Sequence, residues 1–235
     1  YPYSLINNGL VAVYPALTQS IKTDVAVIGG GISGALAAYY LVNAGLDCVV
    51  VDARSIGLGS TCASTSLLQY ELDKPLSVLS KQIGFRSASR AYKMCSEAID
   101  TIQRISNKIN FKLFEKTKSL YFAAYKKDKK LMESEFEYRK KAGFNVKLLS
   151  DNDIQSSFGF TSPSAILSQQ GAMIDAYMFT HALLQSIIKK GCQVFDRTEV
   201  KKIKYKRNGV SLITGRGHNI NARKVVNASG YEITE

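Results

Sequence analysis

The chain has 235 residues, of which 46% are hydrophobic and 21% charged, so it is long enough and apolar enough to bury a sizeable core. It contains no run of about 18 apolar residues, and residues 1–20 lack the basic and apolar regions of a secretory signal, which predicts a cytoplasmic protein without a membrane span. Four scattered cysteines and two histidines argue against a disulfide framework and against a metal site.

The formal charge of +12 raises the question of a nucleic-acid partner. The lysines, however, fall into separate runs at 126–130, 139–141, 189–190 and 201–207. In the last run, apolar residues alternate with lysines, which is typical of a half-buried strand with one solvated face. Because no nucleic-acid motif accompanies these runs, we expect a small-molecule substrate and no nucleic-acid partner.

After an irregular N-terminal arm, residues 24–52 show the pattern of a βαβ unit. The pattern predicts a buried strand at 24–28, a helix at 32–45 and a second buried strand at 47–52. Two parallel strands joined in this way imply a right-handed crossover.

The next part of the chain begins with residues 53–75, which are rich in Gly, Ser and Thr and predict a long loop. A stripe of apolar residues over 86–109 predicts an amphipathic helix. Composition then changes, and we expect strands at 118–125 and 144–150 around a helix at 128–143.

Ser150 and Asp153 match the pattern of a helix capping box. A helix predicted at 176–191 then opens a part of the chain that is otherwise rich in strands. Turn signals at 208–209 and 215–217 separate the last strands, which predicts a β-meander.

Three glycines follow the first predicted strand with the spacing Gly-x-Gly-x-x-Gly. In such a turn Gly29 permits the tight bend, Gly31 lets the backbone approach a pyrophosphate, and Gly34 lets the helix pack closely on the sheet. The N–H groups of residues 32–34 and the helix dipole would then face the phosphates. Asp52, which ends the second strand, is placed to accept hydrogen bonds from a ribose diol.

NAD and FAD sites share this fingerprint, whereas NADP is disfavoured because Asp52 would repel a 2′-phosphate. The segment "GLGSTCASTSLLQYELD" at 57–73 distinguishes an FAD site from an NAD site. Its small hydroxyl residues, followed by an apolar pair, can run along an extended FAD. A nicotinamide-binding domain usually goes straight into its next helix and strand, so the residues favour FAD, with NAD as the alternative.

The sequence resembles the FAD-dependent oxidoreductases of the D-amino acid oxidase superfamily, which includes glycine oxidase, sarcosine oxidase and glycerol-3-phosphate dehydrogenase-like proteins. The resemblance rests on "TDVAVIGGGISGALAAYYL", "VVVDARSIGLGSTCAS", "GAMIDAYMFTHALLQSIIKKG", "TEVKKI" and "KVVNASG", which occur in the family's order and together cover nearly the whole chain. It implies that FAD is the cofactor, that Asp52 holds the ribose and that Val200 touches the adenine through its backbone. The cofactor-binding residues that it implies are Gly29, Gly31, Ile32, Ser33, Gly34, Asp52, Ala53, Arg54, Ser60, Thr61, Ala63, Ser64, Thr65, Leu67, Leu68, Val200, Ala228, Ser229 and Gly230.

The implied fold class is α/β, with a Rossmann-like FAD-binding domain that begins with the βαβ unit and includes the β-meander. Residues 1–110 and 176–235 would form this discontinuous domain, and residues 111–175 an interleaved α+β segment of a substrate domain. Two departures from the family stand out: the family more often has Glu at position 52, and its members continue well beyond Gly230. We therefore expect this chain to be the N-terminal portion of a longer protein.

The reaction that the resemblance implies is hydride transfer from a small amine or amino acid to flavin N5, with oxygen or another compound as the electron acceptor. The alternatives are oxidation of an alcohol such as a glycerol phosphate, and a flavin-binding fragment without activity. No catalytic residue is assigned, because the family places its substrate-binding arginine largely beyond residue 235.

Five further side chains have chemistry of their own. Gln69 and Tyr70 either approach the flavin or belong to the core and loop packing. Cys62 and His181 are expected to be packed side chains, and His218 is expected to be exposed to solvent.

Overall fold

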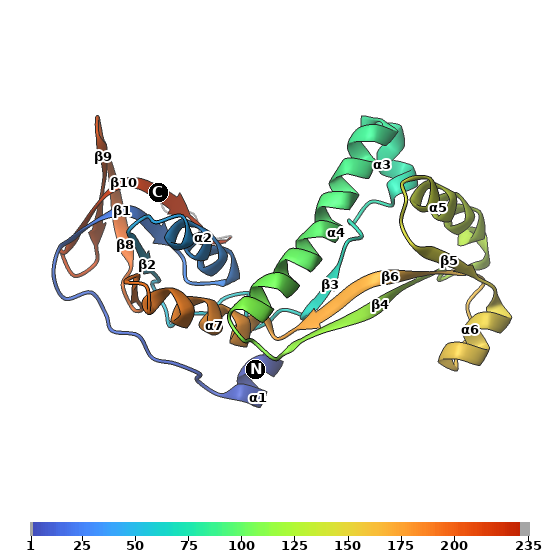
Figure 1. Cartoon of the computed structure of the whole chain (residues 1–235), viewed down its shortest axis with the longest axis horizontal. Helices are drawn as coiled ribbons and strands as arrows, with labels where there is room; N and C mark the ends of the chain where they lie inside the picture. Colours follow the sequence, from blue (N-terminus) through green and yellow to red (C-terminus); the bar gives the residue numbers. More distant parts are fainter. Residues whose placement is uncertain (1, 231–235) are drawn as a thin grey trace. The chain divides into compact units, whose positions relative to one another are not determined.

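The computed structural model describes residues 2–230, which divide into two compact units. Among these residues, unit 1 comprises 2–66, 109–113 and 175–230, and unit 2 comprises 67–108 and 114–174. Figure 1 shows the elements of both units in chain order, coloured from blue at the N-terminus to red at the C-terminus. Within residues 2–230, no helix combines the length and the apolar character needed to cross a bilayer.

Unit 1 is built on one mixed six-stranded sheet with the strand order β7-β2-β1-β10-β9-β8. Strands β7, β2, β1 and β10 run parallel to one another, whereas β10, β9 and β8 form an antiparallel meander. The bounds are β1 Ile21–Ile28, β2 Cys48–Val51, β7 Gln193–Phe195, β8 Val200–Lys206, β9 Gly209–Thr214 and β10 Asn219–Asn227. The predicted α/β class, βαβ unit and β-meander are confirmed.

The core of unit 1 lies along this sheet, where buried apolar residues of β1, β2, β9 and β10 pack in one cluster. Every residue of β2 is buried, as expected for a parallel strand covered on both faces. Helices α2 (Ile32–Asn43) and α7 (Ala176–Ile188) pack against each other in this unit. Tyr205, expected on a half-buried face of its strand, is 76% exposed because it lies on β8 at the edge of the sheet.

Unit 2 is built on a second sheet, in which β6 (Ala165–Ile174) pairs with all three other strands in antiparallel register. Figure 1 shows the helices around it, and two clusters join helices to β6: Ala172 packs with Tyr92 of α4, and Ala165 packs with Ile154 of α6. The remaining bounds are β3 Leu67–Gln69, α3 Leu76–Ile83, α4 Phe85–Lys108, β4 Phe114–Phe122, η1 Lys126–Asp128, α5 Lys129–Lys141, β5 Val146–Leu149 and α6 Asp151–Phe158.

Several elements differ from the sequence-based expectation. The N-terminal arm, expected to be irregular, contains helix α1 (Tyr3–Asn8), and the long loop gives way to β3 and α3. Strand β6 was not predicted, because its polar residues and Gly171 interrupt the apolar alternation. Residues 67–108 cluster with unit 2, while the division into an FAD-binding domain (1–110 and 176–235) and a substrate-domain segment (111–175) stays a prediction.

The predicted capping box at the start of α6 is confirmed. Asp153 N–H donates to Ser150 Oγ at 3.3 Å, and Ser150 N–H donates back to Asp153 Oδ2 at 2.9 Å. This reciprocal pair satisfies two backbone donors at the helix start and fixes where α6 begins.

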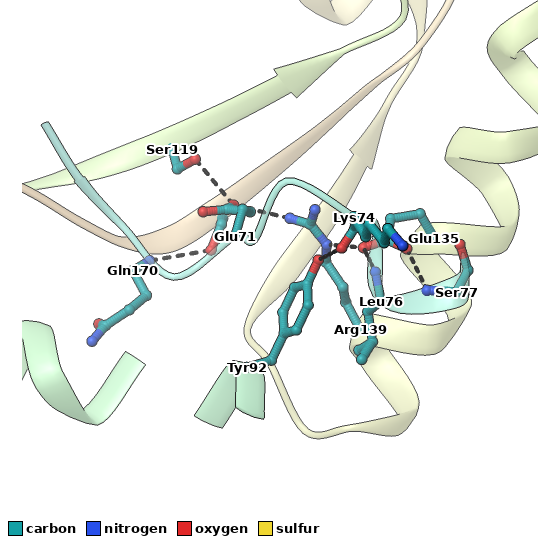
Figure 2. A network of polar contacts seen from close by, with 10 residues as sticks. Glu71, Lys74, Leu76, Ser77, Tyr92, Ser119, Glu135, Arg139 and Gln170 are labelled. Atoms are coloured by element: carbon teal, nitrogen blue, oxygen red, sulfur yellow. Dashed lines mark hydrogen bonds and ion pairs between the residues drawn. The ribbon is translucent and has the colours of Figure 1, made fainter. Parts of the chain in front are cut away.

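Unit 2 also contains a buried network of charged groups, which Figure 2 shows from close by. Glu135 of α5 is fully buried, and its two carboxylate oxygens accept the N–H groups of Leu76 at 2.9 Å and Ser77 at 2.7 Å. Glu135 thereby caps α3, which has no side-chain cap of its own at Pro75. Arg139, which is 1% exposed, neutralises Glu135 through a 2.7 Å bond from its Nε.

We predict that Glu135→Ala lowers the free energy of unfolding by about 3–5 kcal/mol, because it breaks a buried ion pair and leaves two backbone donors of α3 without an acceptor. Chemical denaturation followed by circular dichroism measures the change. The matched control is Glu133→Ala, at an exposed position of the same helix, which should stay within about 0.5 kcal/mol of the wild type. Equal losses in the two variants would show that the network does not hold α3.

Candidate functional site

The turn between β1 and α2 leaves no room for side chains. Gly29 has a φ of +105°, and a Cβ built on it would lie 2.4 Å from the backbone oxygen of Ala228. Ala228 approaches so closely because its N–H donates to Ile28 O at 2.7 Å, at the end of the parallel pairing of β1 with β10. Only glycine fits position 29, for reasons of both backbone conformation and space.

The third glycine of the motif sets the distance between α2 and the turn. A Cβ on Gly34 would lie 1.9 Å from Gly29 O, so the first turn of the helix rests directly on the backbone of the turn. Gly31 is the N-cap of α2 and supplies no side-chain cap. The Thr61 side chain supplies part of the missing cap, because its Oγ1 accepts the N–H of Ile32 at 3.0 Å. The positive end of the helix dipole therefore lies among backbone groups and one hydroxyl.

Asp52 joins this turn to the loop that follows β2. Its Oδ2 accepts the Gly30 N–H at 2.7 Å, and its Oδ1 accepts the Arg54 N–H at 2.8 Å. A carboxylate offers about four lone pairs, so each oxygen keeps the capacity to accept a further hydroxyl donor. The backbone oxygen of Asp52 also accepts the Thr198 N–H at 2.7 Å, which links this loop to the segment before β8.

These elements surround a cavity of about 480 Å³ in unit 1, at the carboxyl ends of β1 and β2. Ligands of open α/β sheets bind at such strand ends, and the volume lies within the usual range for small-molecule pockets. The predicted site residues that line the cavity are Gly29, Gly31, Ile32, Ser33, Asp52, Ala53, Arg54, Ser60, Thr61, Val200, Ala228, Ser229 and Gly230.

The remaining predicted site residues do not line this cavity. Gly34 lies beneath the turn and acts through the close packing described above. Ala63, Ser64 and Thr65 belong to the same loop but lie off the cavity wall. Leu67 and Leu68 are part of β3, in unit 2.

The cavity wall also contains residues that the sequence did not single out as site residues: Ile28, Val51, Gly57, Leu58, Gly59, Thr198 and Glu199. Ile28 and Val51 are the last residues of β1 and β2, so the ends of the predicted strands could have pointed to them. Thr198 and Glu199 belong to the "TEVKKI" segment of the resemblance, directly before Val200, and the bond from Thr198 N–H to Asp52 O holds this segment against the loop after β2.

Behind the loop of the cavity lies a cluster of buried aromatic side chains. A Cβ on Gly57 would lie 2.9 Å from the ring of Tyr177 and 3.6 Å from His181 Nε2, so the loop packs directly on α7. The ring of His181 stacks on Tyr14 at 5.8 Å, and its Nδ1 is hydrogen bonded to the Tyr14 hydroxyl at 3.0 Å. Burial lowers the pKa of His181 to about 4 and raises the pKa of Tyr14 to about 12, so both side chains are neutral at physiological pH.

The other candidate side chains are accounted for as follows. Cys62 is a buried thiol that donates to Gly59 O, and His181 is a packed histidine, as expected. Tyr70 is fully buried in a core cluster of unit 2, whereas Gln69 is exposed. His218, expected to be exposed, is half-buried. It lies in the β9–β10 turn, where its backbone N–H donates to the Thr214 hydroxyl. Among residues 2–230 all four cysteines are free, and no three metal-ligating side chains cluster together.

The parallel strands, the glycine turn and the cavity at the strand ends define a Rossmann-like fold, a class in which dinucleotides commonly bind at this position. Residues 24–235 match the DAO family of FAD-dependent oxidoreductases, and the chain belongs to this family. The family assignment agrees with the resemblance drawn from the sequence.

Two relatives show how much of such a protein the chain represents. It is 27% identical over 220 residues to YhfW of Bacillus subtilis (strain 168), provisionally named a Rieske 2Fe-2S iron–sulfur protein, with 93% of this chain and 42% of that protein covered. It is 26% identical over 198 residues to gamma-glutamylputrescine oxidoreductase of Escherichia coli (strain K12), with 83% and 46% covered. The chain therefore spans less than half the length of these relatives.

A solved structure shares the fold. Glycine oxidase from Geobacillus kaustophilus superposes with a TM-score of 0.76 at 17% identity, over 89% of this chain and 55% of that one. At this level of identity the likeness concerns the fold alone.

We predict that the free energy of unfolding of the wild type falls as the pH drops from about 6.5 to about 4, in part through His181. Its pKa is lower in the folded state, so in this window the unfolded chain binds more protons and acid favours unfolding. His181→Gln removes this titration, and the variant should lose less stability over the same window. His218→Gln leaves His181 in place and should keep the wild-type fall; identical pH profiles for all three proteins would contradict the prediction.

Proposed function

We propose that unit 1 binds FAD in the cavity between the β1–α2 turn and the loop after β2. The observation that carries the proposal is the turn itself, where backbone replaces side chains at Gly29 and Gly31 and the positive end of α2 lies on the cavity wall. An anionic pyrophosphate suits such a wall. The family assignment supports FAD as the dinucleotide.

The residues present fit the parts of FAD as follows. Asp52 would accept the ribose hydroxyls, because it lines the cavity and both of its oxygens keep lone pairs beyond their backbone bonds. Val200, at the start of β8, would lie against the adenine. The pyrophosphate would lie between the start of α2 and the turn 228–230. Thr61 already accepts the Ile32 N–H, so its hydroxyl proton would be the part directed to a phosphate oxygen.

We further propose that the substrate is a small amine or amino acid. FAD, when bound, supplies the acceptor for a hydride from the substrate carbon next to the nitrogen. The role of this chain would be to hold the cofactor in one position, through the glycine turn, Asp52 and the loop that packs on α7. The names of the relatives support the amine class: the Escherichia coli protein is a gamma-glutamylputrescine oxidoreductase, and the structural neighbours include a glycine oxidase.

An alcohol such as a glycerol phosphate is the second candidate. The chain is also 25% identical over 195 residues to one component of the anaerobic glycerol-3-phosphate dehydrogenase of Haemophilus influenzae, covering 79% of this chain and 31% of that one. The formal charge of +12 would suit an anionic substrate of this kind.

We predict that the purified chain takes up FAD and that Gly31→Val abolishes the uptake. Gly31 has φ −77° and ψ −175°, a backbone conformation open to valine, and an added Cβ meets only the Thr61 hydroxyl, at 3.0 Å, so the substitution fills the approach to the phosphates at the cost of a small shift of Thr61. Flavin absorbance of the desalted protein and quenching of FAD fluorescence measure the binding, and circular dichroism verifies the fold.

Gly215→Val, in the β9–β10 turn, is the matched control, because an added Cβ there meets nothing closer than 3.7 Å. This variant should bind FAD like the wild type. Wild-type FAD affinity in Gly31→Val would overturn the assigned site.

We predict that an amine or amino acid bleaches the flavin absorbance of the FAD-loaded protein under anaerobic conditions, and that glycerol phosphate does not. The same preparation is offered a panel of primary amines, amino acids and glycerol 3-phosphate. Bleaching by glycerol 3-phosphate alone would replace the amine proposal with the alcohol one. Retention of the colour with every compound would assign the chain the role of a flavin-binding portion without activity of its own.

A further inference from the structure

The β8–β9–β10 meander of unit 1 has one apolar side and one basic side. The apolar side packs in the core through Ile203 and Leu212, which pair with each other across β8 and β9. Side chains alternate along a strand, so Lys202 and Lys204, the neighbours of Ile203, point to the other side of the sheet. Lys206 continues the same alternation. None of the functions argued above makes use of this basic side.

The register of the sheet extends the basic side from β8 to β1. Lys204 pairs with Ser211 of β9, and Ser211 pairs in turn with Asn221 of β10. Asn221 then pairs with Lys22 of β1. Residues paired across neighbouring strands point to the same side of a sheet, and three strand spacings amount to about 14 Å. We call the lysines of this side the basic face: Lys22, Lys202, Lys204 and Lys206.

No carboxylate neutralises the basic face among the described residues. Its four lysines are exposed, and none of them forms an ion pair within residues 2–230. The residues of β9 paired with its β8 lysines are uncharged: Ile213, Ser211 and Gly209. Asp24, two positions after Lys22, is paired with Arg223 at 3.2 Å. Glu199, which precedes β8, is paired with Lys201 at 2.7 Å.

Protection of a sheet edge accounts for part of this arrangement. Lysines on an edge strand prevent pairing with other chains, which explains the charges of β8. Strand β1, however, lies between β2 and β10 inside the sheet, where there is no edge to protect. The exposed Lys22 on this inner strand shows that the basic side is open to solvent there as well.

The residues around the lysines decide which anionic partner fits. The aromatic ring of the hairpin, Tyr205, pairs with Val210 on the apolar side, whereas sheets that bind single-stranded nucleic acid stack bases on aromatic rings. Protein partners are usually held by a buried apolar or aromatic centre, and Ile213, the apolar neighbour of these lysines, is half-buried. A bilayer with anionic lipids attracts basic residues through charge alone. Its charges extend over an area, as the lysines extend over four neighbouring strands.

We propose that the basic face binds the surface of an anionic lipid bilayer, as a peripheral contact that inserts no apolar segment. The contact goes beyond the proposed function, because it needs neither flavin nor substrate. FAD uptake and vesicle binding are separate measurements, so failure of either proposal leaves the other untouched.

The test uses the 235-residue chain without added flavin, sedimented with vesicles of phosphatidylcholine that contain about 30% phosphatidylserine. We expect binding at about 0.1 M salt and an affinity at least about tenfold lower at about 0.5 M, because salt screens exposed charges. Vesicles of phosphatidylcholine alone should not bind. Equal binding to both kinds of vesicle, or binding to neither, would refute the proposal. Tighter binding to a double-stranded oligonucleotide in the same buffer would refute the choice of lipid as the partner.

A triple variant of β8 locates the contact: Lys202→Gln, Lys204→Gln and Lys206→Gln. It removes three of the four charges and leaves the apolar side of β8 unchanged, so affinity for the anionic vesicles should fall at least about tenfold. The matched control removes three charges at exposed positions of unit 2: Lys126→Gln, Lys127→Gln and Lys130→Gln. This control should bind like the wild type, and equal losses in the two variants would assign the binding to net charge and contradict the proposal.

Circular dichroism verifies that both triple variants are folded. Should the β8 variant not fold, Lys22→Gln takes its place, because this lysine belongs to the same face but to another strand. Its loss should weaken binding to the anionic vesicles about fivefold. Unchanged binding in Lys22→Gln would then count against the basic face.

Discussion

The structure of unit 1 depends on the point where the backbones of β1, α2 and β10 meet. Gly34 brings the start of α2 onto Gly29, and Gly29 in turn lies against Ala228 at the end of β10. A single methyl group at position 29 or 34 would collide with backbone, which cannot move aside as a side chain can. The distance between helix and sheet, the position of the helix dipole and the wall of the cavity all follow from this contact.

Hydrogen bonds connect this meeting point of three backbones to the rest of the cavity wall. Asp52 binds the turn through Gly30 and the following loop through Arg54, and its carbonyl fixes the segment before β8 through Thr198. On the far side of the loop, Tyr177 and His181 leave no space beyond Gly57. The loop is therefore held from both sides before any ligand arrives, which reduces the ordering cost of binding.

Local patterns predicted those parts of the protein that are determined locally. The strand, glycine turn, helix and strand of residues 24–52 and the capping box at Ser150 follow from neighbouring residues, and the sequence located both. Helix α3 could not be found in this way, because the carboxylate that caps it is Glu135, about 60 residues further along the chain. Strand β6 could not be found from its own residues for a similar reason. It pairs with three other strands, and these pairings hold it in the sheet although its sequence contains polar residues.

The candidate site shows the same division. Residues on the glycine turn, Asp52 and the turn at 228–230 line the cavity, and each belongs to a motif that couples a residue type to a backbone shape. Ala63 to Leu68 lie off the cavity wall, where the chain passes into β3, and their role in cofactor binding stays a prediction. Nothing local marks where a loop departs from a cavity, because that depends on which sheet the next strand joins.

The pairing of β1 with β10 has a consequence for the order in which the chain folds during synthesis. Ile21 pairs with Ile220, about 200 residues later, so the central sheet of unit 1 cannot close until β10 has left the ribosome. The sheet of unit 2, in contrast, draws all of its strands from residues 67–174. The inserted unit can therefore fold first, while the first βαβ unit waits for the strand that completes the cavity at its strand ends.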